Sequence, residues 1–384
     1  MPVYCDYSAT TPLRPEVLQE MLPYLTTHFG NASSSHSFGR EAKRVVDGQR
    51  RKIAELLGVR PGEITFTSGG TEADNFALRG SIRQFNIRHL ITTRIEHKAV
   101  LAPLRQLAQR GRIDLHFVAL DAQGRIVLPD FIRLLQQYPG ALVSLMHANN
   151  EIGNVLDTEA IASLCRRYGG LFHSDTVQTV GKLAFPAGDI DFGAASAHKF
   201  SGPKGIGFLY NRGSKALPPI LAGGGQENGL RGGTENVAGI VGLARALELA
   251  LTEQAVTISR LEKLKSRFIH RLSGIGKAVA FNGQSRSVPD CLPGLVSVRF
   301  PATDQPLAEL LDNRGIAVSG GSACSNLAGG SHVLHELPGA GNGQTIRFSF
   351  GKDNTEEDLD LIIRSLQEIY AVPSRRIRQA EALR

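Results

Sequence analysis

The chain has 384 residues, of which 42% are hydrophobic and 21% are charged. This composition is typical of a soluble globular protein, and the length is enough for two or three domains with sizeable cores. The formal net charge of +7 would suit a nucleic acid or another anionic partner, but the basic residues are scattered except in the C-terminal PSRRIRQAEALR. We interpret that cluster as a solvated tail first, so a nucleic-acid partner is not expected.

The four cysteines, Cys5, Cys165, Cys291 and Cys324, lie far apart and form neither a CxxC pair nor a zinc-ligand pattern. No apolar run is long enough to span a membrane, and the N-terminal MPVYCDYSATTP lacks the features of a secretory signal. We therefore predict a cytoplasmic protein with free thiols and no resident metal. Cys165 lies in an amphipathic helical pattern and is expected in the core. For Cys5 and Cys291 the sequence does not distinguish a core residue from a reactive thiol.

Apolar spacing in the first part of the chain predicts helices at residues 14–25 and 39–58. Short strand-like runs follow at residues 63–69, 89–97, 114–120, 141–150, 170–175, 192–199 and 205–210. Helical segments such as residues 157–169 separate several of them, which is typical of an α/β fold with a mainly parallel sheet between helices. A long helical pattern from Glu235 to Leu272, with a break near Thr252, leads out of this part.

The second part of the chain is mixed. Strands are predicted at residues 294–300, 315–321 and 345–350, and helices at residues 304–314 and 355–372. We therefore place a large domain at residues 14–250 and a smaller α+β domain at residues 1–13 and 251–384.

Polar residues stand where several of the apolar runs end, and ligands bind at the carboxyl ends of strands in open α/β sheets. Gly70 and Thr71, in TSGGTEADN, follow a strand and open a helix, where backbone amides favour a phosphate. Taken singly, a glycine turn required by sterics is the stronger interpretation of this motif. Asp175 ends another apolar run, where its carboxylate would pair with a pyridinium nitrogen or cap a helix.

Lys199, in SAHKFSGPKGIG, follows a strand-like run and is surrounded by small residues. A lysine at a strand end, near a phosphate loop and a buried aspartate, is the arrangement that pyridoxal phosphate (PLP) needs for a Schiff base and an electron-accepting ring. Ser196 and His198 would add phosphate contacts. The alternative is a surface lysine with a buried stem, and Lys204 fits that description better.

Three further residues are open to two interpretations each. His97 could stack on a planar cofactor and move protons, or be a hydrogen-bonded structural residue. Asn150 could bind a substrate or cap a turn, and Arg347 could bind a substrate carboxylate or form an internal ion pair. For Cys324, the Gly- and Ser-rich surroundings favour a reactive thiol over a core residue.

Seven motifs occur in one order along the chain: TSGGTEADN, EHKAV, HANNEIG, DTVQTVGK, SAHKFSGPKGIG, GGGQENGLRGGTEN and GSAC. This ordered set resembles the cysteine desulfurases of the NifS/IscS type, which are PLP-dependent enzymes of fold type I in the class V aminotransferase family. The resemblance covers nearly the whole chain. It implies a PLP-binding large domain around a mainly parallel seven-stranded sheet, and a small domain that carries the loop with the catalytic cysteine.

The resemblance also implies the reaction and the roles of the site residues. L-Cysteine would be converted to L-alanine, with its sulfur left as a persulfide on Cys324. Lys199 would form the Schiff base, and His97 would stack on the ring and take part in proton transfer. The implied cofactor-binding residues are Gly70, Thr71, Asn150, Asp175, Gln178, Ser196, His198, Lys199 and Thr234.

Within that set, Asp175 would pair with the ring nitrogen and Gln178 with the ring hydroxyl. The phosphate would be held by Gly70, Thr71, Ser196 and His198. Thr234 would reach the phosphate of the neighbouring subunit, which implies a homodimer with shared sites. Asn150 and Arg347 would bind the substrate carboxylate.

The implied partner is a sulfur acceptor, either an iron–sulfur scaffold or a relay for tRNA or cofactor thiolation. The long segment after Cys324 resembles the long-loop class that delivers sulfur directly to a scaffold, with which Cys324 could transiently ligate a cluster. The chain departs from the family pattern at Asn228, where arginine is usual, and at Gly232, where serine is common. Its loop lacks an acidic–proline stretch, and it ends soon after the last predicted helix, without the tail by which some members dock a scaffold.

Two other functions compete with desulfuration. A PLP-dependent C–S lyase acting on cysteine or cystine, or a selenocysteine lyase, would use the same scaffold; the C–S lyase would not need Cys324. A catalytically silent sulfur relay or RNA-binding protein would suit the net charge, but the combination of Lys199, Asp175 and the SGGT loop argues against it.

Overall fold

The computed structural model describes the chain except residues 1, 288–289, 321–329, 338–342 and 372–384. Cys324 and the basic C-terminal cluster therefore lie outside the described residues. Within the described part, no helix is both long and apolar enough to cross a bilayer.

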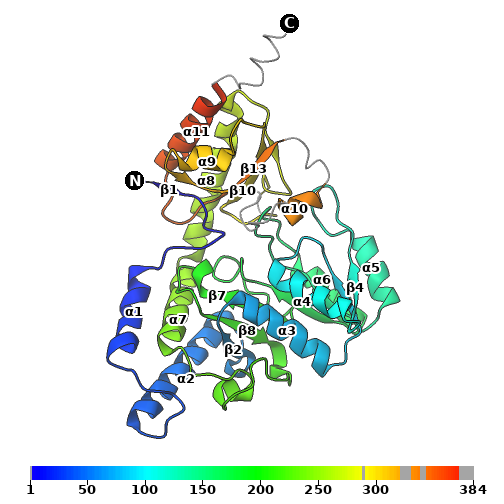
Figure 1. The fold of residues 1–384 in the computed structure, drawn as a ribbon, viewed down its shortest axis with the longest axis vertical. Coiled ribbons are helices and arrows are strands. Elements are labelled where there is room, and N and C mark those ends of the chain that lie inside the picture. The colour runs from blue at the N-terminus through cyan, green and yellow to red at the C-terminus, as the bar shows by residue number, and fades with distance from the viewer. Residues whose placement is uncertain (1, 288–289, 321–329, 338–342, 372–384) are drawn as a thin grey trace.

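A seven-stranded sheet forms the centre of the molecule (Figure 1). Its strands, in spatial order, are β2 (Ile64–Thr67), β8 (Gly207–Asn211), β7 (Phe192–Ser196), β6 (Leu171–Asp175), β5 (Leu142–Ser144), β3 (His89–Thr92) and β4 (Asp114–Phe117). All neighbouring pairs are parallel except those of β8, which runs antiparallel to β2 and β7. The chain passes from β7 to β8 without an intervening α-helix, and a short link of this kind allows only an antiparallel neighbour. The predicted mainly parallel sheet is confirmed.

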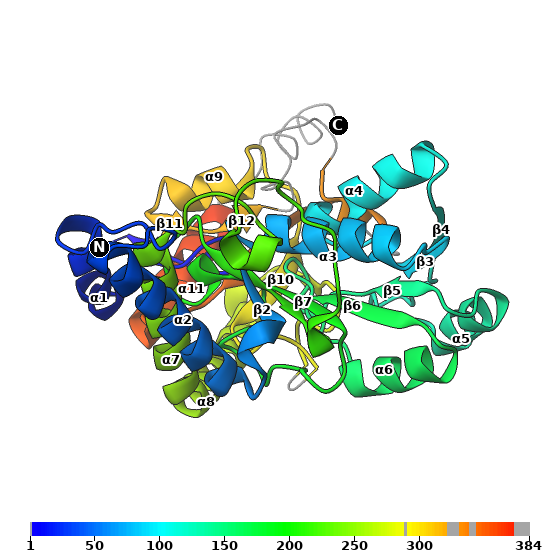
Figure 2. The same cartoon turned by 90° about the horizontal axis from the view of Figure 1, so that it is seen from below.

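Helices cover both faces of this sheet. Figure 2 shows α3 (Gly70–Gln84) and α4 (Lys98–Gln109) over one face and α6 (Thr158–Arg167) at the other, next to α5 (Leu128–Gln137). Because both faces are covered, the strands are almost continuously apolar. Cys165 of α6 is buried in the main core, as predicted.

Three helices pack together at one side of the sheet. α7 (Val237–Thr252) packs against α1 (Pro15–Thr26) and α2 (Ser37–Leu57), and its first eight residues are all buried. α8 (Gln254–Leu272) follows after Glu253, so the predicted break in the long helix near Thr252 is confirmed.

A second, antiparallel sheet has the strand order β12 (Ser319–Gly320), β13 (Gln344–Ser349), β10 (Leu295–Phe300) and β9 (Ala280–Phe281). Its core includes residues of α8, α9 (Leu307–Asp312) and α11 (Glu356–Ala371). The N-terminal strand β1 (Val3–Tyr4) pairs with β11 (Ile316–Ala317), so β1 and the last described helix, α11, both contribute to this core. A short helix, α10 (His332–His335), precedes β13 in the chain. The domain boundaries near residues 13 and 250 stay a prediction.

Three predicted strands have different ends. The segment 315–321 is not one strand, because β11 pairs with β1 while β12 pairs with β13. β3 and β5 stop at Thr92 and Ser144, well before His97 and Asn150. After β5 the chain still bonds to β6, from Leu145 N to His173 O and from His147 N to Asp175 O, before Asn149 turns it away.

One buried ion pair ties α2 to the loop after β8. Arg50 Nη2 lies 2.6 Å from Glu227 Oε1, and Glu227 Oε2 accepts a hydrogen bond from Phe66 N in β2. Glu227 and Asn228 both have positive φ angles, of 48° and 55°, a conformation that asparagine tolerates better than most residues. The pair therefore holds a strained turn against the sheet.

We predict that Arg50→Met lowers the free energy of unfolding by about 3–5 kcal/mol, because Glu227 would be left as an uncompensated buried charge. Urea denaturation followed by circular dichroism measures the effect. Lys43→Met is the control, since Lys43 forms an exposed pair with Asp47 that is worth less than about 1 kcal/mol. Equal losses in the two variants would contradict the prediction.

Candidate active site

One cavity of about 470 Å³ lies beyond the ends of β6 and β7. It brings together most of the site residues predicted from the sequence: Gly70, Thr71, His97, Asn150, Asp175, Gln178, Ser196, His198, Lys199 and Arg347. Thr234 does not line it, and Cys324 lies outside the described residues.

Lys199 follows β7 directly, in a single 3₁₀ turn. Its Nζ donates hydrogen bonds to the carbonyl oxygens of Ser8 and Ala9, at 2.7 and 2.9 Å. Thr11 Oγ1 donates a hydrogen bond to His198 O, so the N-terminal segment is hydrogen-bonded to the turn that contains Lys199. Lys204 is exposed in the following loop. The amine of Lys199 is thus held at the cavity rather than extended into solvent.

Asp175 ends β6 and is buried. Its Oδ1 accepts a hydrogen bond from Val177 N at 2.9 Å, and turns rather than a helix follow it, so the helix-cap interpretation is wrong. Burial raises the pKa of Asp175, while the nearby His97 and Lys199 act in the opposite direction. A cationic ring nitrogen would be a suitable partner for this carboxylate.

Gln178 has an incomplete set of hydrogen bonds. Its Nε2 donates to Ser8 O at 2.9 Å, whereas its buried Oε1 has no hydrogen-bond partner within the described part of the chain. A buried carboxamide oxygen at a cavity wall is an acceptor for a ligand hydroxyl.

The start of α3 forms another wall of the cavity. A Cβ at Gly70 would lie 2.4 Å from Val177 Cγ2, so glycine is needed there for close packing. No side chain caps the first turn of α3, and the backbone amides at a helix start attract anions. Both interpretations of this turn, steric and phosphate-binding, are therefore compatible with the structure.

His198 and His97 are both neutral near pH 7. Burial, reinforced by Lys199, lowers the pKa of His198 to about 4, and its Nδ1 lies 3.0 Å from Thr10 Oγ1. Burial also lowers the pKa of His97, whose Nδ1 accepts a hydrogen bond from Ala99 N at the start of α4. That bond leaves Nε2 as the nitrogen of His97 that holds the proton of the neutral ring.

Arg347 lies on β13 and reaches across to the central sheet. Its Nη1 donates to Asn150 O at 2.7 Å, and its Nη2 donates to Asp6 Oδ1 at 2.7 Å and to Ser319 Oγ at 2.8 Å. The internal ion pair considered from the sequence is therefore present. The Nε atom is buried and has no hydrogen-bond partner among the described residues.

The turn beside Arg347 is capped by Asn149, not by Asn150. Asn149 Oδ1 accepts hydrogen bonds from Glu151 N and Ile152 N, and its Nδ2 donates to Ile95 O. The turn-capping alternative for Asn150 is therefore wrong, and the Asn150 side chain lines the cavity.

Thr234 is exposed and lines a separate, smaller pocket with Ser68, Gly205 and Arg231. Gly232, two residues earlier, packs so tightly that an added Cβ would lie 2.8 Å from Gly223 Cα. With this backbone a serine at position 232 would not fit without a shift, which accounts for one departure from the family pattern.

The sequence analysis did not identify three buried ionisable residues near the cavity, Asp74, Glu96 and His173, because no local sequence pattern predicts that a charged residue is buried. Asp74 of α3 has both carboxyl oxygens buried without a hydrogen-bond partner in the described part of the chain, although Oδ1 lies 3.3 Å from His173 Nε2. Burial, then Asp175 and Glu96, raise the pKa of Asp74. Burial also raises the pKa of Glu96 to about 8 and lowers that of His173 to about 3. Burial therefore favours the protonated forms of both Asp74 and Glu96.

We predict that Asp74→Asn stabilises the protein more at pH 8 than at pH 5. The raised pKa means that the folded wild type keeps a proton that the unfolded chain loses above its ordinary value near 4, so wild-type stability falls as the pH rises. Asparagine has no such proton. Urea unfolding at both pH values measures the difference.

Asp47→Asn, at an exposed position on α2, is the matched control. An equal effect of Asp74→Asn at the two pH values would show that Asp74 is ionised in the folded protein.

Comparisons with known proteins agree with this geometry. Residues 3–362 match the family described as aminotransferase class-V. The chain is 40% identical over 375 residues to "Cysteine desulfurase IscS" of Dictyoglomus turgidum, covering 96% of this chain and 94% of the relative. It is 39% identical over 378 residues to "Putative cysteine desulfurase IscS 1" of Bacillus subtilis, covering 96% and 98%.

The fold agrees as well. A solved structure titled "NIFS-LIKE PROTEIN" superposes with a TM-score of 0.88 at 37% identity, covering 97% of this chain and all of that one. The structure titled "SspA in complex with cysteine" superposes with a TM-score of 0.77 at 32% identity, covering 92% and 100%. The resemblance stated from the motifs is thereby confirmed.

Proposed function

The chain belongs to the aminotransferase class-V family, among its cysteine desulfurases of the IscS/NifS type, and we propose that it uses PLP to move the sulfur of L-cysteine onto Cys324. The observation that carries this proposal is the convergence of Lys199, Asp175 and Gln178 on one cavity beside the start of α3. The alternative of a catalytically silent protein would leave that convergence unexplained.

The residues present fit PLP. Lys199 would attach the cofactor, and Asp175 would pair with the ring nitrogen. The Oε1 of Gln178, which has no partner among the described residues, would accept a hydrogen bond from the ring hydroxyl. The amides of Gly70 and Thr71, with Ser196 and His198, would hold the phosphate. Bound PLP would act as an electron sink that stabilises negative charge developing on the carbon atoms of the amino acid substrate.

Arg347 and Asn150 would bind the substrate carboxylate. The guanidinium of Arg347 is fixed by three hydrogen bonds and its Nε has no described partner, so it is oriented before substrate arrives. His97 would stack on the cofactor ring and hold a proton at Nε2, the nitrogen not used by Ala99. Arg347, Asn150 and His97 all line the same cavity as Lys199.

Cys324 is proposed as the nucleophile on two grounds. Burial raises the pKa of the other three thiols, Cys5, Cys165 and Cys291, so none of them is a ready thiolate. In addition, Ser319 is hydrogen-bonded to Arg347 at the cavity, and five residues span up to about 17 Å. Cys324 is therefore within reach of a substrate bound by Arg347.

Ser331 and His332 also bond next to the cavity: Ser331 contacts Glu151, and His332 Nε2 lies 2.9 Å from Glu96 O, and these partners precede or follow the lining residues Asn150 and His97. In the proposed step, Cys324 Sγ forms a bond to the substrate sulfur while the Cβ–S bond breaks. The electron pair of that bond stays with Cβ, which takes a proton to give alanine, and the persulfide remains on Cys324.

We propose a homodimer with shared sites. Thr234 is exposed and does not line the cavity of its own chain, as expected if it contacts the phosphate of a neighbour. Leu18, Leu22 and Leu25 are exposed at helical spacing on α1, and the exposed rings of Phe29 and Phe38 stack on each other. Exposed large apolar side chains gathered in this way are typical of a protein contact.

We further propose a cytoplasmic enzyme that passes the persulfide sulfur to an acceptor protein. The names of the IscS relatives favour an iron–sulfur scaffold over a thiolation relay. Cys324 would meet such a scaffold directly and could transiently ligate its cluster.

We predict that Lys199→Ala abolishes the visible absorbance of the attached cofactor and reduces desulfuration by at least about 10³-fold, because the amine that forms the Schiff base would be lost. Absorption spectra of the purified protein and sulfide release measure the two effects. Lys263→Ala, at an exposed position on α8 outside the cavity, is the control and should keep both. Retained colour and turnover in Lys199→Ala would exclude the lysine assignment.

We predict that wild type releases alanine from L-cysteine in the presence of a reductant, and that Cys324→Ala keeps the cofactor colour but loses persulfide and alanine formation. Ser325→Ala is the neighbouring control. Pyruvate as the main product, unaffected by Cys324→Ala, would identify a C–S lyase instead.

A further inference from the structure

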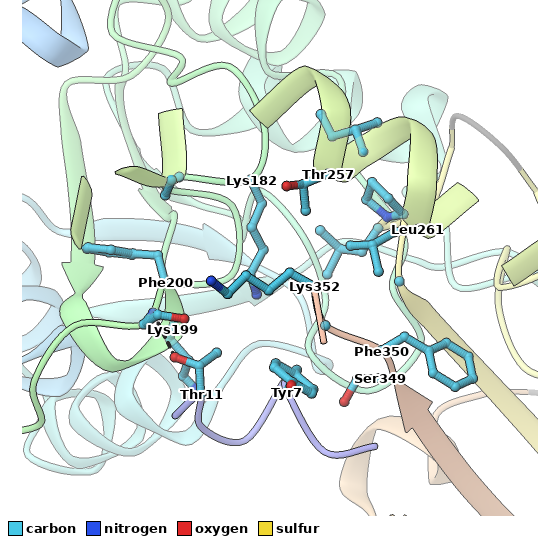
Figure 3. Close-up of a pocket in the computed structure, with 18 of the residues that line it drawn as sticks. Tyr7, Thr11, Lys182, Lys199, Phe200, Thr257, Leu261, Ser349, Phe350 and Lys352 are labelled. Atoms are coloured by element: carbon cyan, nitrogen blue, oxygen red, sulfur yellow. Dashed lines mark hydrogen bonds between the residues drawn. The ribbon is translucent and has the colours of Figure 1, made fainter. Parts of the chain in front are cut away.

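A second cavity, of about 120 Å³, shares Ser8 and Lys199 with the cavity described above but is otherwise lined by different residues. It lies among the start of α8, the end of β13 and the N-terminal segment (Figure 3). Its walls are mainly apolar: Phe200, Ile258, Leu261, Leu292, Leu295 and Phe350. One buried water occupies about 10–15 Å³, so a cavity of this volume can hold a small ligand of several non-hydrogen atoms.

Two lysines, Lys182 and Lys352, line this cavity. In the described part of the chain, only Lys352 of the two has carboxylates nearby, Glu16 and Glu253, and both are already paired with Arg14. Figure 3 shows the side chains of Lys182 and Lys352 extending into it. Among the residues that the structure describes, neither ammonium group has a hydrogen-bond or ion-pair partner. Both side chains are only partly exposed, so water compensates them incompletely.

The other charged groups at this cavity are already engaged. Arg14 is paired with Glu253 at 2.7 Å and with Glu16 at 2.8 Å. Lys199 donates to the carbonyl oxygens of Ser8 and Ala9. The hydroxyl of Tyr7 donates to Asp353 at 3.2 Å. The cavity therefore has an excess of positive charge, located at Lys182 and Lys352.

We propose that this cavity is a binding site for a small organic anion, a carboxylate with a short aliphatic chain. The carboxylate would meet Lys182 and Lys352, and the chain would pack on Phe200, Leu261 and Phe350. An inorganic anion would satisfy the lysines but leave the apolar walls without a partner, whereas an uncharged apolar molecule would leave the lysines uncompensated. This site is separate from the proposed desulfuration and does not depend on it.

The charge of Lys182 gives the site a pH dependence. Burial first, then Lys199 and Arg347, lower the pKa of Lys182 to about 7. An anion favours the charged amine, so it binds with uptake of a proton. Of the other facing groups, Lys199, Lys352 and Arg14 are cations and Glu253 is already paired. Affinity should therefore fall as the pH rises from 6 to 8.5, by up to about tenfold per pH unit above 7.

The experiment is a titration of the purified protein, with its cofactor bound, against butyrate, butanol and butylammonium, followed by the shift of the melting temperature and by calorimetry. Butyrate should give a saturable stabilisation that the neutral and cationic analogues do not. Lys182→Met, which keeps the aliphatic stem and removes the charge, should weaken butyrate binding about tenfold or more. Lys263→Met, at an exposed position on α8, is the control.

Lys352→Met provides a second test should Lys182→Met not fold, and it should weaken binding in the same way. No saturable butyrate binding would overturn the proposal. Binding that survives both lysine changes but is lost in Arg347→Ala would also overturn it, because the anion would then occupy the larger cavity. Desulfurase activity is not the readout, so failure here leaves the proposed function unaffected.

Discussion

The carbonyl oxygen of Ser8 is the point on which the site depends. It accepts hydrogen bonds from Lys199 Nζ at 2.7 Å and from Gln178 Nε2 at 2.9 Å, and so joins the two turns that follow β6 and β7. The N-terminal segment is itself fixed by pairing of β1 with β11 and by the contact of Asp6 with Arg347. A single stretch of about ten residues thus connects the second sheet to the residues at the end of the central sheet.

This connection explains why groups from distant parts of the chain meet with fixed geometry. Arg347 on β13 reaches Asn150 only because Asp6 and Ser319 orient its guanidinium from the other side. The same arrangement brings Ser319, the last strand region before Cys324, to within 2.8 Å of Arg347. In the proposed reaction, the arginine that would bind the substrate carboxylate is thus also bonded to Ser319 of β12, five residues before Cys324.

The electrostatics of the site come from burial more than from ion pairing. Burial raises the pKa values of Asp74, Glu96 and Asp175 and lowers those of His97, His198 and Lys182. Burial therefore favours the neutral forms of these groups, and a bound ligand of opposite charge would favour the charged forms of Asp175 and Lys182. The cost of these uncompensated polar atoms is balanced by the large apolar cores on either side.

The sequence by itself determined the alternation of helices and apolar strands, the break near Thr252, and the polar residues at the strand ends. These follow from periodicity and from the rule that ligands bind at the carboxyl ends of parallel strands, which act over short distances along the chain. Only the tertiary structure decided that Asn149 rather than Asn150 caps the turn, that Asp175 caps no helix, and that Arg347 pairs with Asp6. It alone revealed Asp74 and Lys182, because burial of a charge is set by the packing of segments far apart in sequence, and no local pattern records it.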